Sequence, residues 1–359
     1  MKKIARIFAV VVVVALLSAS SVWAGNDKRR GTAGAPELLI NPWAGSTGWG
    51  GVDIANVRGL QSFYSNVAGL AFIAKNEVAY SNAMYLGGTS KLTGGASINA
   101  FGLGVRVFES GVLAVHVMSM GFGQIDVTTV GSPDGGNGTF SPSFMNINIA
   151  YSHSFTNSIH GGMNIKIITE QTADVNASGF AIDAGIQYVT GENDELKFGI
   201  SLKNWAPAMS FGGPGLSRTT IDDAGNTVTL ESRSAEMELP TCLNIGISYD
   251  FLFEQNDQKI TLAGAFTSNA FLRDNFTFGA QYSLLNMFQV RCAYVYQTGL
   301  WSGENRATAN MGICGGASVT VPLGKKSDKG STPDLTVDYS YRHANPLRGT
   351  HTIGASLRF

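Results

Sequence analysis

The sequence has few charged residues and no long apolar run beyond its first residues. Asp, Glu, Lys and Arg make up 14% of the 359 residues, whereas soluble globular proteins have about 25%. After Leu17, no apolar run reaches the roughly 20 residues that a membrane-spanning helix needs. Glycine is abundant instead, with 44 residues. Such a composition favours a closed β-barrel in an outer membrane, with an exported β-sandwich as the soluble alternative.

Residue patterns that carry chemistry are also missing. The three cysteines, Cys242, Cys292 and Cys314, fit no zinc spacing, and their odd number leaves at least one without a disulfide partner. The histidines form no HExxH pair, and no G-x-S-x-G elbow occurs. Ser152 and His153 are adjacent, so they would point to opposite faces of a strand. We therefore expect a non-enzymatic protein with no catalytic residues, no cofactor and no metal site.

The first 24 residues predict export. A basic start, "MKK", precedes an apolar run over 7–17, and "VWA" at 22–24 matches a cleavage site. The run is too short for a spanning helix, so residues 1–24 are interpreted as a cleaved signal peptide. Loss of its three positive charges takes the formal net charge from −1 to −4. Nothing in this charge balance suggests a nucleic-acid partner.

Apolar residues alternate with small or polar residues along most of the chain. In "GFAIDAGIQY", 179–188, Phe180 and Ile182 share one face, and Asp183 and Gln187 share the other. The same period of two appears in "LKFGISLK", "LNIGISYD" and "LTVDYSYR". Many such segments have the length of a tilted bilayer-spanning strand, and several end in tyrosine as at a membrane interface. The polar faces carry charges that a polar lumen would pair or hydrate, among them Lys166, Asp183, Arg291 and Arg358.

Fourteen alternating segments can be counted. They start near residues 75, 91, 111, 142, 158, 177, 194, 237, 258, 274, 287, 308, 332 and 349. The two longest gaps, 124–141 and 205–236, both follow odd-numbered segments, whereas several gaps after even-numbered segments are very short. Long loops on one side and short turns on the other are typical of outer-membrane barrels. We predict an all-β, antiparallel barrel of about fourteen strands over 75–359, with the long loops extracellular.

Residues 25–74 have no strand pattern. The stretch "NPWAGSTGWGG" is rich in glycine and tryptophan, and "GLQSFYSNVAGLAFI" is mixed with turn signals. Disordered segments are poor in aromatic residues, so we expect this segment to pack in the barrel lumen as a plug rather than to form a disordered leader. The residues expected to form the plug, and to contact any ligand, are Trp43, Trp49, Phe63, Asn66, Gly69 and Leu70.

Seven stretches carry a family resemblance. They are "GTAGAPELLI" (31–40), "STGWGGVDIANV" (46–57), "NVAGLA" (66–71), "IAYSHSFTNSIHGGMNIKII" (149–168), "LKNWAPAMSF" (202–211), "LPTCLNIGISY" (239–249) and "GTHTIGASLRF" (349–359). In this order they resemble the PorV/PorQ family of outer-membrane proteins, which is similar to the FadL-type barrels. The family's Asn-Pro-Ala-Gly-Leu motif is matched at Asn66, Ala68, Gly69 and Leu70, with Val67 in place of the proline.

The resemblance implies a fourteen-stranded barrel in the bacterial outer membrane, with its N-terminal segment in the lumen. It also implies two kinds of function. The main prediction is an accessory role in type IX secretion, in which the barrel receives cargo with a C-terminal signal domain beside a large translocon. The alternative is a FadL-like channel for hydrophobic small molecules.

The final stretch predicts the seam of the barrel. In "THTIGASLRF", Ile353 and Leu357 would face lipid and Thr352 and Arg358 the lumen. We expect this strand to pair with the first one, so that no strand edge is left in lipid. Phe359 resembles the terminal aromatic that the barrel-assembly machinery reads. The expected partners are therefore outer-membrane lipid and that machinery, besides a secretion translocon with its cargo or a hydrophobic small molecule.

Overall fold

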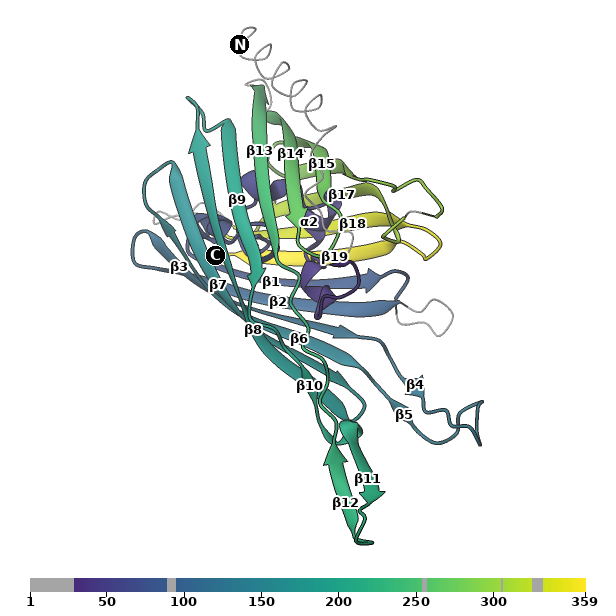
Figure 1. The fold of residues 1–359 in the computed structure, drawn as a ribbon. Coiled ribbons are helices and arrows are strands. Elements are labelled where there is room, and N and C mark those ends of the chain that lie inside the picture. The colour runs from purple at the N-terminus through teal and green to yellow at the C-terminus, as the bar shows by residue number, and fades with distance from the viewer. Residues whose placement is uncertain (1–28, 89–94, 254–256, 305, 325–331) are drawn as a thin grey trace.

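Fourteen antiparallel strands close into a barrel in the computed structural model, which describes residues 29–88, 95–253, 257–304, 306–324 and 332–359 (Figure 1). The strands of the wall are β1 (Asn76–Tyr85), β2 (Ala96–Val107), β3 (Gly111–Gly121), β6 (Ser143–Ser154), β7 (Ile159–Thr172), β8 (Val175–Thr190), β9 (Leu196–Trp205), β13 (Cys242–Phe253), β14 (Gln258–Asn269), β15 (Asn275–Leu284), β16 (Phe288–Gln297), β17 (Asn310–Pro322), β18 (Asp334–Ala344) and β19 (Thr350–Arg358). The predicted barrel is confirmed. The predicted signal peptide, residues 1–24, lies outside the described residues.

One strand starts later than the sequence predicted: β13 begins at Cys242 rather than near 237. β2 is described from Ala96, and its predicted start near 91 lies outside the described residues. For β13 the reason is Pro240, which has no N–H to donate to the ladder and is therefore excluded from a paired strand. Met237 forms only an isolated bridge, with Met209.

The barrel closes where the prediction placed its seam. β1 pairs with β19 from Glu77 opposite Arg358 to Met84 opposite His351. Beyond this ladder, the N–H groups of Asn76 and Phe359 each donate to the other residue's carbonyl oxygen at 3.0 Å. The wall backbone is thus paired across the seam, as a hydrocarbon environment requires.

The two faces of the wall have the predicted chemistry. On β8, Phe180 and Ile186 are 51% and 57% exposed, whereas Asp183 and Gln187, which point into the lumen, are 2% and 1% exposed. The final strand follows the same rule, with Ile353 exposed and Thr352 buried. The outer face is therefore apolar, and much of the inner face is polar.

The two longest loops project from the same end of the barrel, here called the long-loop end (Figure 1). They contain hairpins that the sequence prediction left as loops: β4 (Ile125–Asp126) with β5 (Thr139–Phe140), and β11 (Ser217–Ile221) with β12 (Thr227–Glu231). The turn of the second hairpin is closed by Asp222, whose carboxylate accepts hydrogen bonds from the N–H groups of Ala224 and Asn226 at 3.0 and 2.8 Å. The opposite end, here called the short-turn end, has connections such as 155–158 and 285–287.

The residues before β1 form only short helices. They are η3 (Pro36–Leu39), α2 (Ala44–Gly48), η4 (Asp53–Ala55), α3 (Ser62–Ser65) and η5 (Val67–Phe72). In the described part of the chain, no helix is long and apolar enough to cross a membrane. These helices contact strands from opposite parts of the wall, β6, β7 and β8 by η5 and β17 and β18 by α2, and so lie inside the barrel.

Deletion of Phe359 is expected to reduce the amount of folded barrel in the membrane, because its backbone completes the seam with Asn76. The yield is measured in outer-membrane fractions as the heat-modifiable band on electrophoresis. Deletion of Asp223 and Ala224, in the exposed turn of β11–β12, is the control and should leave the yield unchanged. Equal yields of the two deletions would refute a special role for Phe359.

Candidate functional site

The candidate site is the lumen and the N-terminal segment, residues 29–75, that passes through it. At the long-loop end, Arg29 forms an ion pair with Glu238 at 2.6 Å, and the Gly34 N–H donates to the Glu238 carbonyl oxygen at 2.9 Å. At the short-turn end, the segment leads into β1 at Asn76. It therefore runs along the whole lumen, and most of its residues between 35 and 73 are buried. The structure thus places the segment in the barrel lumen, and its role as a plug stays a prediction.

On one side of the lumen the segment's backbone packs directly against the wall, because glycines of β8 and β9 leave room for it. A Cβ atom at Gly199 of β9 would lie 2.3 Å from the Ile54 carbonyl oxygen, and one at Gly185 of β8 would lie 2.1 Å from Asn66 Oδ1. These distances are far below van der Waals contact. Since Gly185 pairs with Gly162 of β7, and Gly199 with Gly246 of β13, the bare surface extends over four strands. We call it the glycine face.

Asn66 is the main polar link between the segment and the glycine face. Its Nδ2 donates to the carbonyl oxygens of Ile54 and Ile186 at 3.0 Å each and to that of Ile200 at 3.3 Å. Its Oδ1 accepts from the Ala68 N–H at 3.2 Å and so caps η5. Asn66 thereby connects η4, η5, β8 and β9 from a fully buried position.

Further hydrogen bonds hold the segment nearby. From β8, Gln187 Nε2 donates to the carbonyl oxygens of Ile54 and Val57 at 3.1 and 3.2 Å. Gly69 fits against Val57, since an added Cβ would lie 2.3 Å from the Val57 carbonyl oxygen. Asn66 and Gly69, both predicted to contact a ligand, therefore lie at a junction within the protein.

Arg106 of β2 fixes the end of the segment. Its guanidinium donates to the carbonyl oxygens of Ala71 at 2.8 Å, Ala74 at 2.9 Å and Ile73. The last carbonyls of a helix have no partner within the helix. Arg106 satisfies that of Ala71 in η5 and two carbonyls of the chain that follows the helix. Arg106 was not among the predicted residues, because nothing in the local sequence distinguishes it from other strand arginines.

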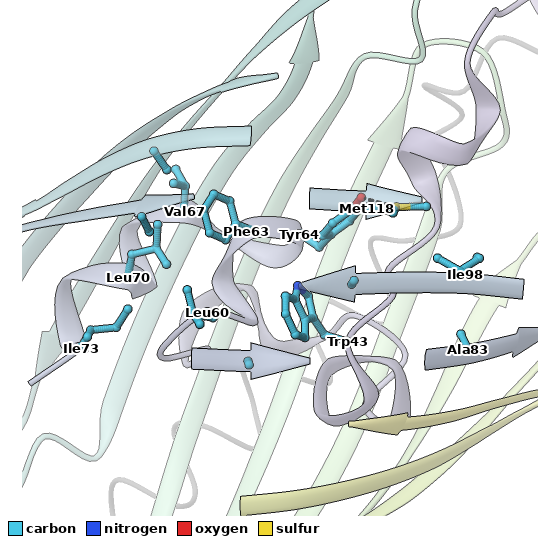
Figure 2. Close-up of a cluster of buried hydrophobic side chains, with 14 of the residues drawn as sticks. Trp43, Leu60, Phe63, Tyr64, Val67, Leu70, Ile73, Ala83, Ile98 and Met118 are labelled. Carbon is cyan, nitrogen blue, oxygen red and sulfur yellow. Dashed lines mark hydrogen bonds between the residues drawn. The ribbon is translucent and has the colours of Figure 1, made fainter. Parts of the chain in front are cut away.

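The opposite side of the segment contacts an apolar part of the wall (Figure 2). The residues of β1, β2 and β3 that make up this surface are small or apolar, and we call them the apolar stripe: Ala79, Ala83, Ala96, Ile98, Ala100, Val112, Ala114, Met118 and Met120. The segment covers it with Trp43, Leu60, Phe63, Tyr64, Val67, Leu70 and Ile73. The stripe reaches from Ala96 at the long-loop end to Val112 at the short-turn end.

Three of the predicted ligand contacts meet on this stripe. Trp43, Phe63 and Leu70 belong to one cluster and are 2% exposed or less. Trp49 lies apart, against Val52 and Ala263. The predicted apolar surface is therefore present but covered by the segment's own side chains, and contact with a ligand stays a prediction.

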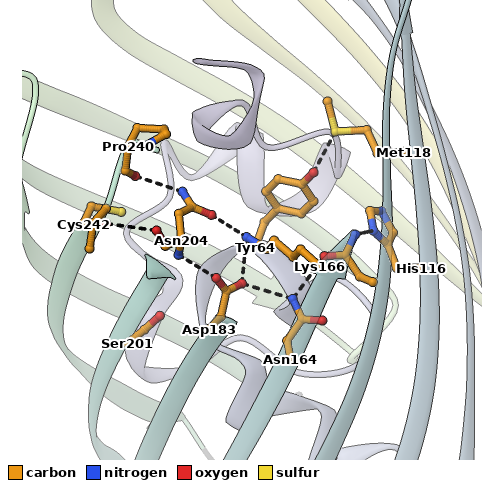
Figure 3. Close-up of polar contacts among 12 residues, drawn as sticks. Tyr64, His116, Met118, Asn164, Lys166, Asp183, Ser201, Asn204, Pro240 and Cys242 are labelled. Atoms are coloured by element: carbon orange, nitrogen blue, oxygen red, sulfur yellow. Dashed lines mark hydrogen bonds and ion pairs between the residues drawn. The ribbon is translucent and has the colours of Figure 1, made fainter. Parts of the chain in front are cut away.

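A buried polar network crosses the lumen face beside the stripe (Figure 3). Lys166 of β7 forms an ion pair with Asp183 of β8 at 2.8 Å and donates to Asn204 Oδ1 at 2.6 Å. Asn164 Nδ2 donates to Asp183 at 3.1 Å. Two of the predicted lumen charges thus pair with each other.

His116 lies at the end of this network, on β3, which also carries residues of the apolar stripe. His116 Nδ1 is 3.0 Å from Asn148 Nδ2, and its ring lies 5.2 to 5.6 Å from the rings of Trp43, Phe63 and Tyr64. His116 is fully buried. The segment's aromatic cluster therefore packs on the edge of the polar network.

A polar cavity of about 590 Å³ lies on the short-turn side of the segment. Its lining includes Trp49, Asp53, Lys197, Asp250 and Arg291. Several charges in this region are paired: Lys197 with Asp250 at 2.7 Å, Arg291 with Asp338 at 3.9 Å, and Arg358 with Asp334 at 2.8 Å. Burial raises the pKa of Asp53, although the hydroxyls of Ser46 and Ser65 donate to it at 2.9 and 2.8 Å.

Comparison with known proteins supports the fold. No family model matches the chain, and no curated protein matches it. The solved structure of the CymD monoaromatic hydrocarbon channel is similar with a TM-score of 0.51 and 12% identity, over 89% of this chain and 97% of that one. The TodX deltaS2S3 mutant monoaromatic hydrocarbon channel gives 0.52 and 13%, over 88% and 98%. The chain thus has the fold of these channels, whereas membership of the PorV/PorQ family stays a prediction.

Gly199→Ala is expected to lower the free energy of unfolding by about 1–3 kcal/mol, the usual effect of overpacking, because the new methyl group would clash with the Ile54 backbone. Urea unfolding of the refolded barrel, followed by tryptophan fluorescence, measures this change. Gly264→Ala on β14 is the matched control, since its Cβ would approach no other atom closer than 3.9 Å. Equal stabilities of the two variants would argue against tight docking on the glycine face.

Proposed function

We propose that the protein is a channel for small hydrophobic molecules in the bacterial outer membrane. The observation that carries this proposal is the apolar stripe, which follows the inner face of β1, β2 and β3 between the two ends of the lumen. Where the segment moves away from it, the stripe would offer an apolar solute a continuous apolar surface along the lumen. The fold shared with hydrocarbon channels supports the same function.

The segment is attached to the wall unevenly, and this asymmetry supports a path along the stripe. Hydrogen bonds from Asn66 and Gln187 hold it to β8 and β9, and such directional bonds are costly to break when buried. Against the stripe residues its contacts are mainly apolar, although Ser81 and Glu77 on the same face of β1 each form one hydrogen bond with it. A hydrophobic molecule can replace the apolar contacts with similar ones. We infer that the segment moves away from the stripe while it stays attached to the glycine face.

The secretion role implied by the family resemblance is the second candidate. The observation that favours it is the pair of hairpins, β4–β5 and β11–β12, at the long-loop end (Figure 1). The strand edges of β11–β12 offer backbone groups to an extended partner chain. Affinity purification from native membranes tests this role: a large translocon barrel or secreted cargo should co-purify, and deletion of the gene should alter the secreted proteins. If neither occurs, the secretion role is excluded.

Met118→Gln is expected to slow uptake of an apolar solute about tenfold, because a buried amide in the path costs on the order of 1–2 kcal/mol to desolvate. Uptake of radiolabelled toluene is measured in cells that lack their own hydrocarbon channels and express each variant. Met145→Gln is the matched control, since Met145 lies on the outer face of the wall.

The expected result is unchanged toluene uptake in the control and a loss in Met118→Gln. Uptake no faster with the wild-type protein than without it would overturn the channel proposal. Equal uptake by Met118→Gln and Met145→Gln would overturn the assignment of the path to the stripe.

A further inference from the structure

Two buried glutamates meet where the N-terminal segment enters the lumen. Glu37 of η3 is 1% exposed and Glu170 of β7 is 4% exposed. The two side chains are neighbours, because Leu38 next to Glu37 packs with Ile168, two residues before Glu170 on the same face of β7. Both side-chain oxygens of Glu37 and Oε1 of Glu170 accept no hydrogen bond from the residues that the structure describes. Buried acceptors left without donors require an explanation, such as a bound ion.

Asn146 of β6 is a third group with the same property. It is 1% exposed, and neither its amide oxygen nor its amide nitrogen has a hydrogen-bond partner within the described part of the chain. Asn146 pairs with Ile168, and Glu170 lies two residues farther along the same lumen-facing side of β7. Asn146 and Glu170 are therefore diagonal neighbours on one face.

The surroundings of the two carboxyl groups are apolar. Ala35, Leu38, Ile168, Ala177, Ala181, Met209 and Leu239 form a buried cluster around η3 and the inner face of β7 and β8. Among the described residues, no Lys, Arg or His forms an ion pair with either glutamate, and the nearby Lys166 is committed to Asp183. Two ionised carboxylates cannot stay together in such a place without a compensating positive charge.

We propose that Glu37, Glu170 and Asn146 bind one Ca²⁺ ion that joins the N-terminal segment to the barrel wall. A divalent cation neutralises both carboxylates, which a monovalent ion would not do. Ca²⁺ takes carboxylate and amide oxygens in irregular arrangements, whereas Mg²⁺ keeps several waters that an apolar surrounding does not favour. Zinc prefers nitrogen and sulfur ligands, which none of these three residues supplies.

Equilibrium dialysis with ⁴⁵Ca²⁺ tests the site, on the mature full chain in detergent after treatment with a chelator, at pH 8. The expected result is one saturable Ca²⁺ per chain, with affinity reduced at least about tenfold in Glu37→Gln and Glu170→Gln, since each loses one charged ligand. Asn146→Ala, which keeps both carboxylates, should also bind more weakly. Glu231→Gln, in the exposed hairpin β11–β12, is the control and should bind as the wild type does.

Several results would overturn the site. They are no saturable Ca²⁺ binding by the wild type, equal binding by the glutamine variants, or equally effective competition by Mg²⁺. The first would mean that the two carboxyl groups share a proton instead. If a glutamine variant fails to fold, Asn146→Ala and the calcium content of the untreated wild type, measured by mass spectrometry, decide the question. None of these readouts depends on transport.

Discussion

The close approach of the N-terminal segment to the glycine face is the contact on which the lumen's organisation depends. Side chains larger than hydrogen at Gly185 and Gly199 would occupy the space of Asn66 and the Ile54 backbone. Because the backbone fits there, Asn66 and Gln187 can donate hydrogen bonds to its buried Ile54 carbonyl group. The segment is therefore part of the folded barrel rather than a loosely held leader.

This docking leaves the two sides of the segment with different properties. Toward β8 and β9 the contacts are hydrogen bonds and backbone packing, which depend on position and direction. Toward β1, β2 and β3 they are mainly side-chain packing against small and apolar residues. Ser81 and Glu77 of β1 each form one hydrogen bond with the segment, and Arg106 holds its last turn. In the proposed channel, the contacts that a hydrophobic molecule replaces are those on the side of the segment that faces away from the glycine face. A Ca²⁺ ion at Glu37 would add a second fixed point on β7, near the long-loop end.

The sequence alone predicted the strands of the wall and the two faces of those strands, but not the contacts of the N-terminal segment within the lumen. Alternation separates the two faces of a strand, so the outward Phe180 and inward Asp183 were predicted correctly. The family motif drew attention to Asn66 and Gly69, yet only the fold shows that they hold the segment to itself and to the wall. Contacts such as Arg106 with Ala71, or Glu37 with Glu170, join residues far apart in the chain. No local pattern marks such pairs, because chain geometry alone brings them together.

Hydrogen–deuterium exchange of the refolded barrel tests the docked segment most directly. Peptides that cover residues 53–73 are compared with peptides from the barrel strands β8 and β9 over minutes to hours. A docked segment predicts slow exchange at 53–73, close to that of the strands, since its backbone is buried and bonded within the lumen. Exchange at 53–73 as fast as in an unstructured peptide, with β8 and β9 still protected, would contradict it.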